Sequence, residues 1–284
     1  MNGTTRERPI GVFDSGAGGL TVLRALRGRL PGERFLYFGD TANLPHGDKS
    51  PWAVRRHARA ACARLVAAEI KMLVVACNTA SAIALDDLTR RFAPLPVLGV
   101  VAPGAARAAD TARARIGLLA TEATLRTGAY TRAILERRPG LSVIGEAAPV
   151  LVALAEQGWH EGPAAEACLE RYLGALRARA PDADVLLLGC THFPPFRPTL
   201  LRLLGPGITV VDSADATAEA AAALLKEKNL LRPGSDGGLV GCTVSDNAER
   251  FRRLAPLFLG EEITEIGVEG GGKEGAPNAA GGGC

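Results

Sequence analysis

The sequence lacks several features that would each define a class of protein. Its six cysteines form no C-x-x-C pair, which argues against a ribbon-type zinc site and a thioredoxin motif. Its longest apolar runs, at 97–102 and 185–189, are far too short to span a membrane. No long apolar segment follows the N-terminal residues MNGTTRERP, so we expect no secretory signal and a reducing, cytoplasmic location.

Clustered positive charge is also absent. Lysine is scarce, and most of the 33 basic residues are arginines spread along Ala- and Leu-rich segments, which leaves a net charge of only +3. A nucleic-acid-binding surface would gather these charges in one patch or stripe. We therefore expect neither a nucleic acid nor a membrane as a partner.

The chain does have the length and apolar content of one or two α/β domains. Its 284 residues are 47% apolar and 22% charged, enough for a core that needs no disulfide. Short apolar runs alternate with longer helical patterns, which predicts a mostly parallel sheet flanked by helices. The expected strands are 10–13, 35–38, 73–76 and 97–101, and the expected helices are 20–30, 52–71, 81–91 and 214–226.

The pattern restarts in the second half of the chain. Residues 116–121 echo 10–15, residues 186–192 echo 73–79, and residues 210–213 echo 97–100. These echoes predict two pseudo-symmetric α/β domains with mostly parallel sheets. The expected first domain comprises residues 1–100 and 211–267, and the second comprises residues 101–210. The Gly-rich segment 268–284 is expected to be a disordered tail, in which Cys284 carries no chemistry.

Two cysteines follow equivalent strands of these halves. Ligands bind at the carboxyl ends of strands in open α/β sheets, so Cys77 and Cys190 are expected on opposite sides of one cleft. Cys77 opens a helix whose dipole favours a thiolate, and His192 is placed to polarise Cys190. The alternatives are buried structural cysteines or, at Cys190, a zinc site that would need further ligands. We expect no metal.

A Gly-rich turn, DSGAGG at 14–19, lies between the first strand and the first helix. Glycines let the backbone approach a ligand closely, and a helix start offers N–H donors to an anion. Thr21 stands where a dinucleotide fingerprint requires its third glycine, and no Gly-Lys-Ser/Thr follows as in a P-loop. The alternative is an ordinary turn in which Asp14 or Ser15 caps the helix.

Five segments taken together resemble glutamate racemase, over about residues 9–258. They are IGVFDSGAGGLTVL, YFGDTANLPHGDKS, VVACNTASA, LLGCTHFPPFRPTL and VDSADATAEA, in this order. The resemblance implies an isomerase that interconverts L- and D-glutamate without a cofactor and supplies D-glutamate for peptidoglycan. It also implies a homodimer.

The same resemblance implies a two-base mechanism at the α-carbon. Cys77 would take the proton from D-glutamate and Cys190 from L-glutamate, one on each face of the substrate. Asp14 would assist Cys77, whereas His192 and, less directly, Glu156 would assist Cys190. For Glu156, a solvated helix face is an equally good interpretation.

Substrate contacts are also implied by resemblance. They fall on Asp14, Ser15, His46, Gly47, Asn78, Thr79, Thr121, Thr191 and His192. The family usually has Pro-Tyr-Gly where this chain has Pro45-His46-Gly47. Because histidine titrates near neutrality, we expect any activity that depends on His46 to change between about pH 6 and pH 7.

Two other functions fit parts of this sequence. An aspartate or broader amino-acid racemase would have the same fold and both cysteines, although the motifs around Asp14 and Lys49 favour glutamate. A protein that only binds an amino acid would leave the cysteines inert. Such a protein has no use for two thiols facing one carbon atom, so racemisation is the better interpretation.

Overall fold

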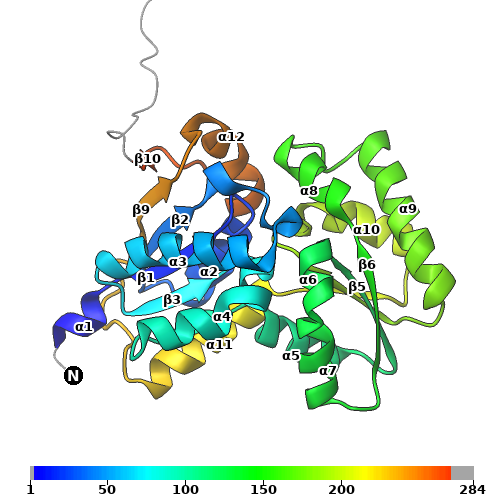
Figure 1. The fold of residues 1–284 in the computed structure, drawn as a ribbon, viewed down its shortest axis with the longest axis horizontal. Coiled ribbons are helices and arrows are strands. Elements are labelled where there is room, and N and C mark those ends of the chain that lie inside the picture. The colour runs from blue at the N-terminus through cyan, green and yellow to red at the C-terminus, as the bar shows by residue number, and fades with distance from the viewer. Residues whose placement is uncertain (1–2, 270–284) are drawn as a thin grey trace, which may run out of the picture.

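Two parallel sheets form the framework of the molecule. The computed structural model describes residues 3–269, and the two sheets lie side by side in it, each with its own helices (Figure 1). All the strand pairs described are parallel, which confirms the predicted α/β class. The first sheet has the order β10-β9-β2-β1-β3-β4 and the second β6-β5-β7-β8.

The strands of the first sheet are β1 (Ile10–Asp14), β2 (Arg34–Gly39), β3 (Met72–Val75), β4 (Val97–Gly99), β9 (Gly238–Val244) and β10 (Gly267–Val268). Those of the second are β5 (Arg115–Ala120), β6 (Ser142–Ala147), β7 (Val185–Gly189) and β8 (Thr209–Asp212). The order β2-β1-β3-β4 repeats as β6-β5-β7-β8, so the echoes in the sequence mark equivalent strands. Strands β9 and β10 extend only the first sheet.

Helices cover the first sheet on both faces. They are α2 (Leu20–Arg29), α3 (Pro51–Ala67), α4 (Asn78–Phe92), α11 (Ala214–Glu227) and α12 (Ala248–Leu259), and the short helix α1 (Gly3–Glu7) precedes β1. Helix α3 shows how the sequence specifies one of them. Ser50 caps its first turn by accepting from the Ala53 amide, and Pro51 follows at a position where no amide donor is needed. Val54, Ala58, Cys62 and Leu65 recur at helical spacing and form its buried face.

Helix α3 ends at Ala67, four residues before the predicted end at Lys71. Glu69 adopts a left-handed backbone conformation with φ of 57°, which stops the helix. The Lys71 amide then donates to the Pro9 carbonyl at the edge of the sheet, and its buried ammonium pairs with Glu33. Tertiary contacts therefore take Lys71 out of a helical pattern that continued in the sequence.

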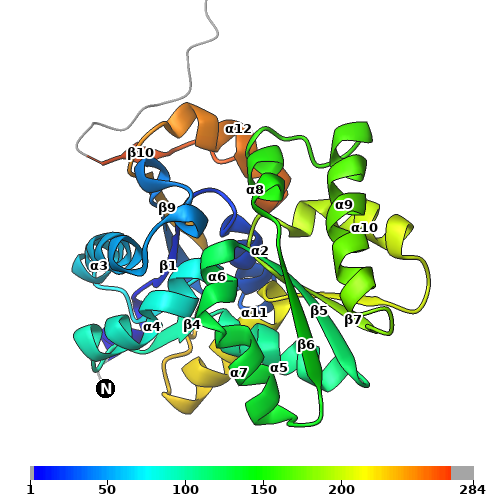
Figure 2. The ribbon, with the colours of Figure 1, turned by 45° about the vertical axis from the view of Figure 1, so that its right-hand side comes forward.

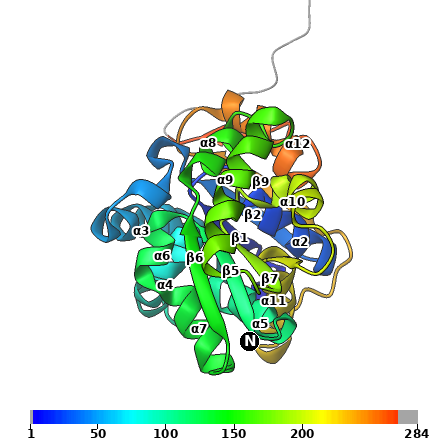
Figure 3. The same cartoon turned by 90° about the vertical axis from the view of Figure 1, so that its right-hand side faces the viewer.

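The second domain carries α5 (Val101–Thr111), α6 (Glu122–Thr127), α7 (Ala129–Arg137), α8 (Pro149–Glu156), α9 (Pro163–Arg179) and α10 (Arg197–Leu204). Seen from its own side, the four-stranded sheet has α8, α9 and α10 around it, with α5 and α7 below (Figure 3). Turning the molecule by 45° shows α6 and α8 on the side of this domain that faces the first (Figure 2).

The chain passes from the first domain to the second after β4 and returns after β8. Leu187 and Leu188 of β7 are in register with Val211 and Asp212, so β8 belongs to the second sheet. The expected boundary, which put residue 211 in the first domain, is therefore wrong by two residues, because β8 continues its pairing with β7. Helix α11 then packs on α2 of the first domain and also contacts α5.

The expected disordered tail began at residue 268, but Val268 and Glu269 pair with Val244 of β9. The remainder of that tail, with Cys284, lies outside the described residues. Among the described helices, none combines the length and apolar character needed to cross a membrane.

Candidate active site

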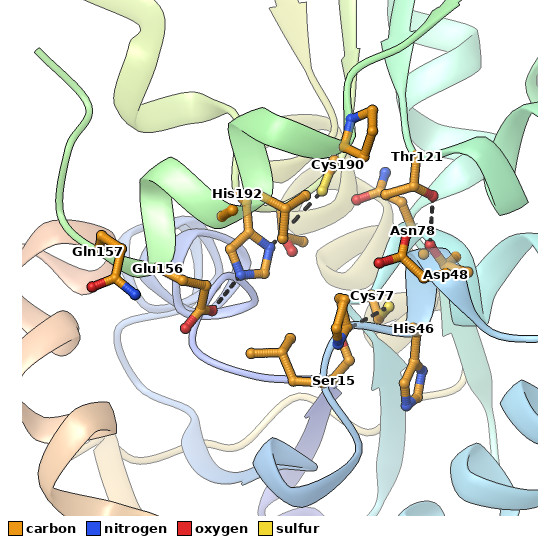
Figure 4. Close-up of a pocket in the computed structure, with 18 of the residues that line it drawn as sticks. Ser15, His46, Asp48, Cys77, Asn78, Thr121, Glu156, Gln157, Cys190 and His192 are labelled. Atoms are coloured by element: carbon orange, nitrogen blue, oxygen red, sulfur yellow. Dashed lines mark hydrogen bonds and ion pairs between the residues drawn. The ribbon is translucent and has the colours of Figure 1, made fainter. Parts of the chain in front are cut away.

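One cavity of about 310 Å³ lies between the two domains and collects the residues singled out from the sequence. Its walls include Ser15, His46, Gly47, Cys77, Asn78, Thr79, Thr121, Glu156, Cys190, Thr191 and His192. Cys77 comes from the first domain and Cys190 from the second, and both side chains face this cavity (Figure 4). Asp14 does not line it, although it lies directly behind the wall.

Cys77 follows β3 and is the N-cap residue of α4. Its Sγ accepts from the Ala80 amide at 3.5 Å, and its thiol donates to the Ser15 hydroxyl oxygen at 3.5 Å. The amides of a helix start and the helix dipole both favour negative charge at this position. Cys77 is therefore placed where a thiolate is stabilised by fixed dipoles.

Cys190 follows β7, the equivalent strand of the second domain. Its Sγ lies 3.9 Å from Nδ1 of His192, whose Nε2 lies 2.6 Å from Oε1 of Glu156. The other carboxylate oxygen of Glu156 lies 3.2 Å from the Arg250 guanidinium. Cys190 is thus the first member of a buried thiol, imidazole and carboxylate series.

Burial and pairing oppose each other in this series. Burial disfavours charge on His192, but Cys190 and Glu156 outweigh it and raise the His192 pKa well above its usual value. Burial likewise opposes ionisation of Glu156, yet His192 and Arg250 hold its pKa below the ordinary range. Both shifts favour an imidazolium beside Cys190. The prediction of Glu156 as a solvated residue does not describe this structure, because Glu156 is buried.

His46 lies in a short 3₁₀ turn, His46–Asp48, and its side chain is completely buried. Its Nε2 lies 3.4 Å from Oδ2 of Asp40, and the other oxygen of that carboxylate, Oδ1, accepts hydrogen bonds from Asn43 and Ser245. Burial lowers the His46 pKa, but interactions with Asp40 and Cys77 outweigh burial and raise it to about 9. The expectation of a pH dependence between 6 and 7 is therefore corrected upward, because a carboxylate stabilises the imidazolium.

Asp14 ends β1 and is fully buried. Its carboxylate accepts from the Gly16 amide at 2.9 Å and from the Thr191 hydroxyl at 3.5 Å. Burial raises the Asp14 pKa, while His192 and the Gly16 amide partly offset this effect. In this structure Asp14 therefore joins the Gly-rich turn to the second domain.

The surroundings of Gly18 explain why the sequence has glycine at this position of the turn. A Cβ atom at Gly18 would lie 2.5 Å from the Thr191 hydroxyl and 2.7 Å from Nδ1 of His192. The turn was expected to approach a ligand, and its closest approach is to Thr191 and His192 of the other domain. Any larger residue at position 18 would displace the partner of Cys190.

Buried polar groups join the domains beside Cys77. The Thr79 hydroxyl lies 3.0 Å from that of Thr121, and the Asn78 amide donates to the Tyr130 hydroxyl at 2.6 Å. Tyr130 also lies 2.7 Å from the Ser213 hydroxyl. These bonds fix the polar side chains that follow Cys77 against the second domain.

Sequence reasoning missed several residues of the site. Asp48, Gln157 and Arg250 also line the cavity, and Asp40 stands behind His46. Asp40 lies within a quoted motif six residues before His46, which was a signal that could have found it. Arg250 is one of several arginines on a helix face, and nothing in its sequence context sets it apart.

The arrangement offers two acid–base groups to one small molecule. Each thiol has a buried imidazole nearby, and each imidazole has a carboxylate on its Nε2. Within residues 3–269, no three His, Cys, Asp or Glu side chains are grouped so as to hold a metal ion. Two α/β domains that each present one cysteine to a shared cavity are the arrangement of an enzyme whose site lies between its domains.

The comparisons with known proteins give the family. Residues 21–221 match the sequence profile of the Asp/Glu/Hydantoin racemase family. The chain is also 42% identical to the glutamate racemase of Chlorobaculum tepidum over 265 residues, which is 93% of this chain and 97% of the relative. This chain therefore belongs to the Asp/Glu/Hydantoin racemase family, a family of isomerases.

Solved structures agree with this assignment. Glutamate racemase from Francisella tularensis in complex with D-glutamate has a TM-score of 0.86 at 31% identity, with 93% of this chain and 97% of that chain covered. Glutamate racemase from Thermus thermophilus in complex with β-chloro-D-alanine has a TM-score of 0.81 at 43% identity, with 92% and 96% covered. The predicted resemblance and fold class are thus confirmed.

Proposed function

We propose that this protein is a glutamate racemase that works without a cofactor through Cys77 and Cys190. The observation that carries the proposal is the cavity that both cysteines enter from different domains (Figure 4). A racemase must remove a proton from one face of the α-carbon and return one to the other face. Two acid–base groups on two walls do this without turning the substrate over.

In the direction from D- to L-glutamate, the Cys77 thiolate takes the α-proton and becomes a thiol. The electron pair of the broken C–H bond remains on the α-carbon and spreads into the carboxylate. The Cys190 thiol then gives its proton to the opposite face and becomes a thiolate. The reverse reaction exchanges the two roles and restores the starting protonation states.

The α-proton is far less acidic than a thiol, so the site must stabilise the carbanion-like transition state electrostatically. The start of α4 contributes fixed dipoles at Cys77, and the His192 imidazolium contributes positive charge at Cys190. Buried sites make such fixed groups more effective than they are in water. His192 can also return or accept the proton of Cys190, while Glu156 keeps its ring in place.

Glutamate is the substrate that the relatives support best. The Francisella relative was solved with D-glutamate, and the curated relatives at about 40% identity are glutamate racemases. We infer that Ser15, Asn78, Thr79, Thr121 and Thr191, which all line the cavity, bind the amino group and the two carboxylates. Gly47 and His46 complete the proposed contact set, whereas Asp14 lies behind the wall and acts through Thr191, which donates to its carboxylate.

Proton exchange at the α-carbon tests this function. L-Glutamate is incubated with the protein in D₂O without added cofactor and followed by proton NMR and circular dichroism. We expect loss of both signals in the parent, and a loss of rate of about 10²–10⁴-fold in Cys77→Ser and Cys190→Ser. Cys168→Ser, at a half-buried helix position outside the cavity, serves as the control.

Faster turnover of L-aspartate than of L-glutamate would instead establish an aspartate racemase. Binding of glutamate with no exchange in the parent would establish a binding protein. Either result would overturn the proposal.

The resemblance also supports a cellular location, a biological role and an oligomeric state for this enzyme. We infer a cytoplasmic homodimer that supplies D-glutamate for peptidoglycan. Rescue of a bacterium that requires D-glutamate tests the role, and sedimentation of the purified protein tests the assembly. A monomer at all protein concentrations, or failure of the active enzyme to rescue growth, would contradict the respective inference.

A further inference from the structure

The two imidazoles of the cavity are held in the same way. His192 places Nε2 against Glu156 and leaves Nδ1 for Cys190. His46 places Nε2 against Asp40 and leaves Nδ1 without a partner of good hydrogen-bond geometry among residues 3–269. In both histidines the carboxylate lies against Nε2, which leaves Nδ1 as the nitrogen available to another group.

The unpartnered Nδ1 of His46 is a buried polar atom at the cavity wall. A buried nitrogen without a partner costs free energy, and such atoms are rare unless they have a function. The side chain has no exposed surface, so bulk water does not reach it. Cys77 lines the same wall and is one of the two groups that raise the His46 pKa. Because both side chains line one cavity, Cys77 is the thiol on which an imidazolium at position 46 would act.

The other groups around His46 also favour its protonated form or leave it unchanged. Asp40 from the preceding turn and Asp14 at the end of β1 supply negative charge. His57 of α3 has its ring centroid 6.1 Å away and its own pKa is lowered, first by partial burial. A neutral His57 adds little repulsion, so Asp40 and Cys77 dominate.

We propose that His46, oriented by Asp40, is the positioning residue of Cys77 and stabilises its thiolate, as His192 does for Cys190. This inference rests on the proposed two-cysteine racemisation and adds to it a second imidazole. It adds a role at Cys77 to the substrate contact proposed for His46. It also gives this chain a side chain that can carry positive charge at a position where the family that it resembles usually has tyrosine.

The proton that Cys77 loses stays within the pair formed by Cys77 and His46. The Cys77 thiol gives its proton to Nδ1 of His46 and keeps the electron pair of the S–H bond, which yields a thiolate beside an imidazolium. Asp40 accepts a hydrogen bond from the Nε2–H group in both states. When Cys77 next takes the α-proton from D-glutamate it becomes a thiol, and it becomes a thiolate again when it gives that proton back to the α-carbon in the reverse reaction. The imidazolium remains charged during both steps.

Alkylation of the cysteines tests this pairing without requiring activity. Iodoacetamide is applied to the whole protein across a pH series, and modification of Cys77 and Cys190 is measured separately by peptide mass spectrometry. In His46→Gln we expect the pH at which alkylation of Cys77 is half-maximal to rise by about one unit or more, and the corresponding pH for Cys190 to stay unchanged. Asp40→Asn should produce a smaller shift in the same direction, because the imidazole remains.

Two further variants complete the series. His46→Tyr keeps an aromatic ring at the site and should shift Cys77 as His46→Gln does, which guards against a variant that fails to fold. His57→Gln removes the neighbouring histidine of α3 and should shift neither cysteine. An unchanged Cys77 midpoint in both folded His46 variants, or an equal shift in His57→Gln, would overturn the proposal.

Isotope effects separate this role from simple substrate binding. The equilibrium constant of racemisation is one, so kcat/KM must fall equally in both directions in any variant. If His46 assists Cys77, proton removal from D-glutamate becomes more rate-limiting in His46→Gln. The isotope effect on kcat/KM should then rise with α-deuterated D-glutamate and not with α-deuterated L-glutamate.

Equal changes with the two enantiomers would contradict the proposal and assign His46 to binding alone. A parent without α-proton exchange would contradict the proposed function, whereas the alkylation shift would still be measured. The two failures are therefore distinguishable.

Discussion

The surroundings of Cys190 and Cys77 differ in how far along the chain their partners lie. His192 follows Cys190 by two residues in the same turn, and Glu156 holds it at 2.6 Å. His46 comes from a separate turn well before Cys77, and Asp40 holds it at 3.4 Å. The duplicated scaffold fixes the two cysteines at equivalent strand ends, while the loops supply the imidazoles in unrelated ways.

The two surroundings also depend differently on the domain interface. Asp40 and His46 both belong to the first domain, although the turn His46–Asp48 also packs against α6 of the second. Glu156 lies on α8 of the second domain, but its second partner, Arg250, lies on α12 of the first. We therefore expect changes on α12 to affect Cys190 more than Cys77.

The largest expected effect comes from removing one thiol at a time. Cys77→Ala and Cys190→Ala should each slow racemisation by about 10²–10⁴-fold, since one proton transfer loses its acid–base group. Cys190→Ala should still exchange the α-proton of D-glutamate in D₂O, and Cys77→Ala that of L-glutamate. Proton NMR of each enantiomer measures this. Exchange of both enantiomers by either variant would remove the distinction between the two faces.

A pH effect on stability comes next and involves His46. Its pKa is raised from 6.5 to about 9, so its stabilising contribution is complete below about pH 6.5 and is lost as the pH rises through 9. The shift corresponds to about 3 kcal/mol at most. Urea unfolding of the parent should show this loss between pH 6.5 and 9, and His46→Gln should show a flatter dependence.

The control for that measurement is His57→Gln, which should follow the parent. NMR titration of the histidine side chains in the parent gives the same information without a variant. A His46 signal that titrates between pH 6 and 7 would contradict the raised pKa.

A smaller effect is expected where Asn78 depends on the second domain. Tyr130→Phe removes the hydroxyl that bonds to Asn78 and Ser213, leaving buried polar groups unpaired. We expect a loss of about 1–3 kcal/mol in the free energy of unfolding. KM should rise with little change in kcat, because Asn78 is a proposed substrate contact. Thermal denaturation and steady-state kinetics check this, and a fall in kcat alone would contradict it.

The smallest effect is expected at Arg250, which is partly exposed. Its ion pair with Glu156 is screened by solvent, so Arg250→Gln should cost under about 1 kcal/mol and reduce activity only a few-fold. Added salt should narrow the difference between variant and parent. Arg253→Gln, an exposed change on the same helix, is the control. A loss as large as that of the cysteine variants would show that Arg250 has a direct role.

Periodicity and turn signals in the sequence were sufficient for the class of fold and the equivalent strand ends. Apolar runs that end in Cys77 and Cys190 predict the sheet edge at which ligands bind, because that relation follows from parallel topology. The cavity then contains nearly all the expected residues. These predictions rest on local sequence patterns, which tertiary contacts alter little at the ends of the strands.

Three features could not be obtained in this way. The extent of β8 depends on its register with β7, which local sequence does not carry. Strands β9 and β10 have no counterpart in the repeat, and β10 is only two residues long. The protonation of His46 depends on Asp40, whose carboxylate reaches the ring only after two 3₁₀ turns fold the segment back.

The return of the chain after β8 has a consequence for how such a protein can be built. The second domain begins at α5 and ends just before α11, and these two helices pack together. A Cβ atom at Gly104 would lie 2.4 Å from the Ser213 hydroxyl, so the outgoing and returning segments touch. A module whose two ends meet can be inserted into, or removed from, a host chain without stretching it. Because its two ends lie together, the junction between α5 and α11 is the place at which we expect a relative's second domain to be joined in a chimeric protein.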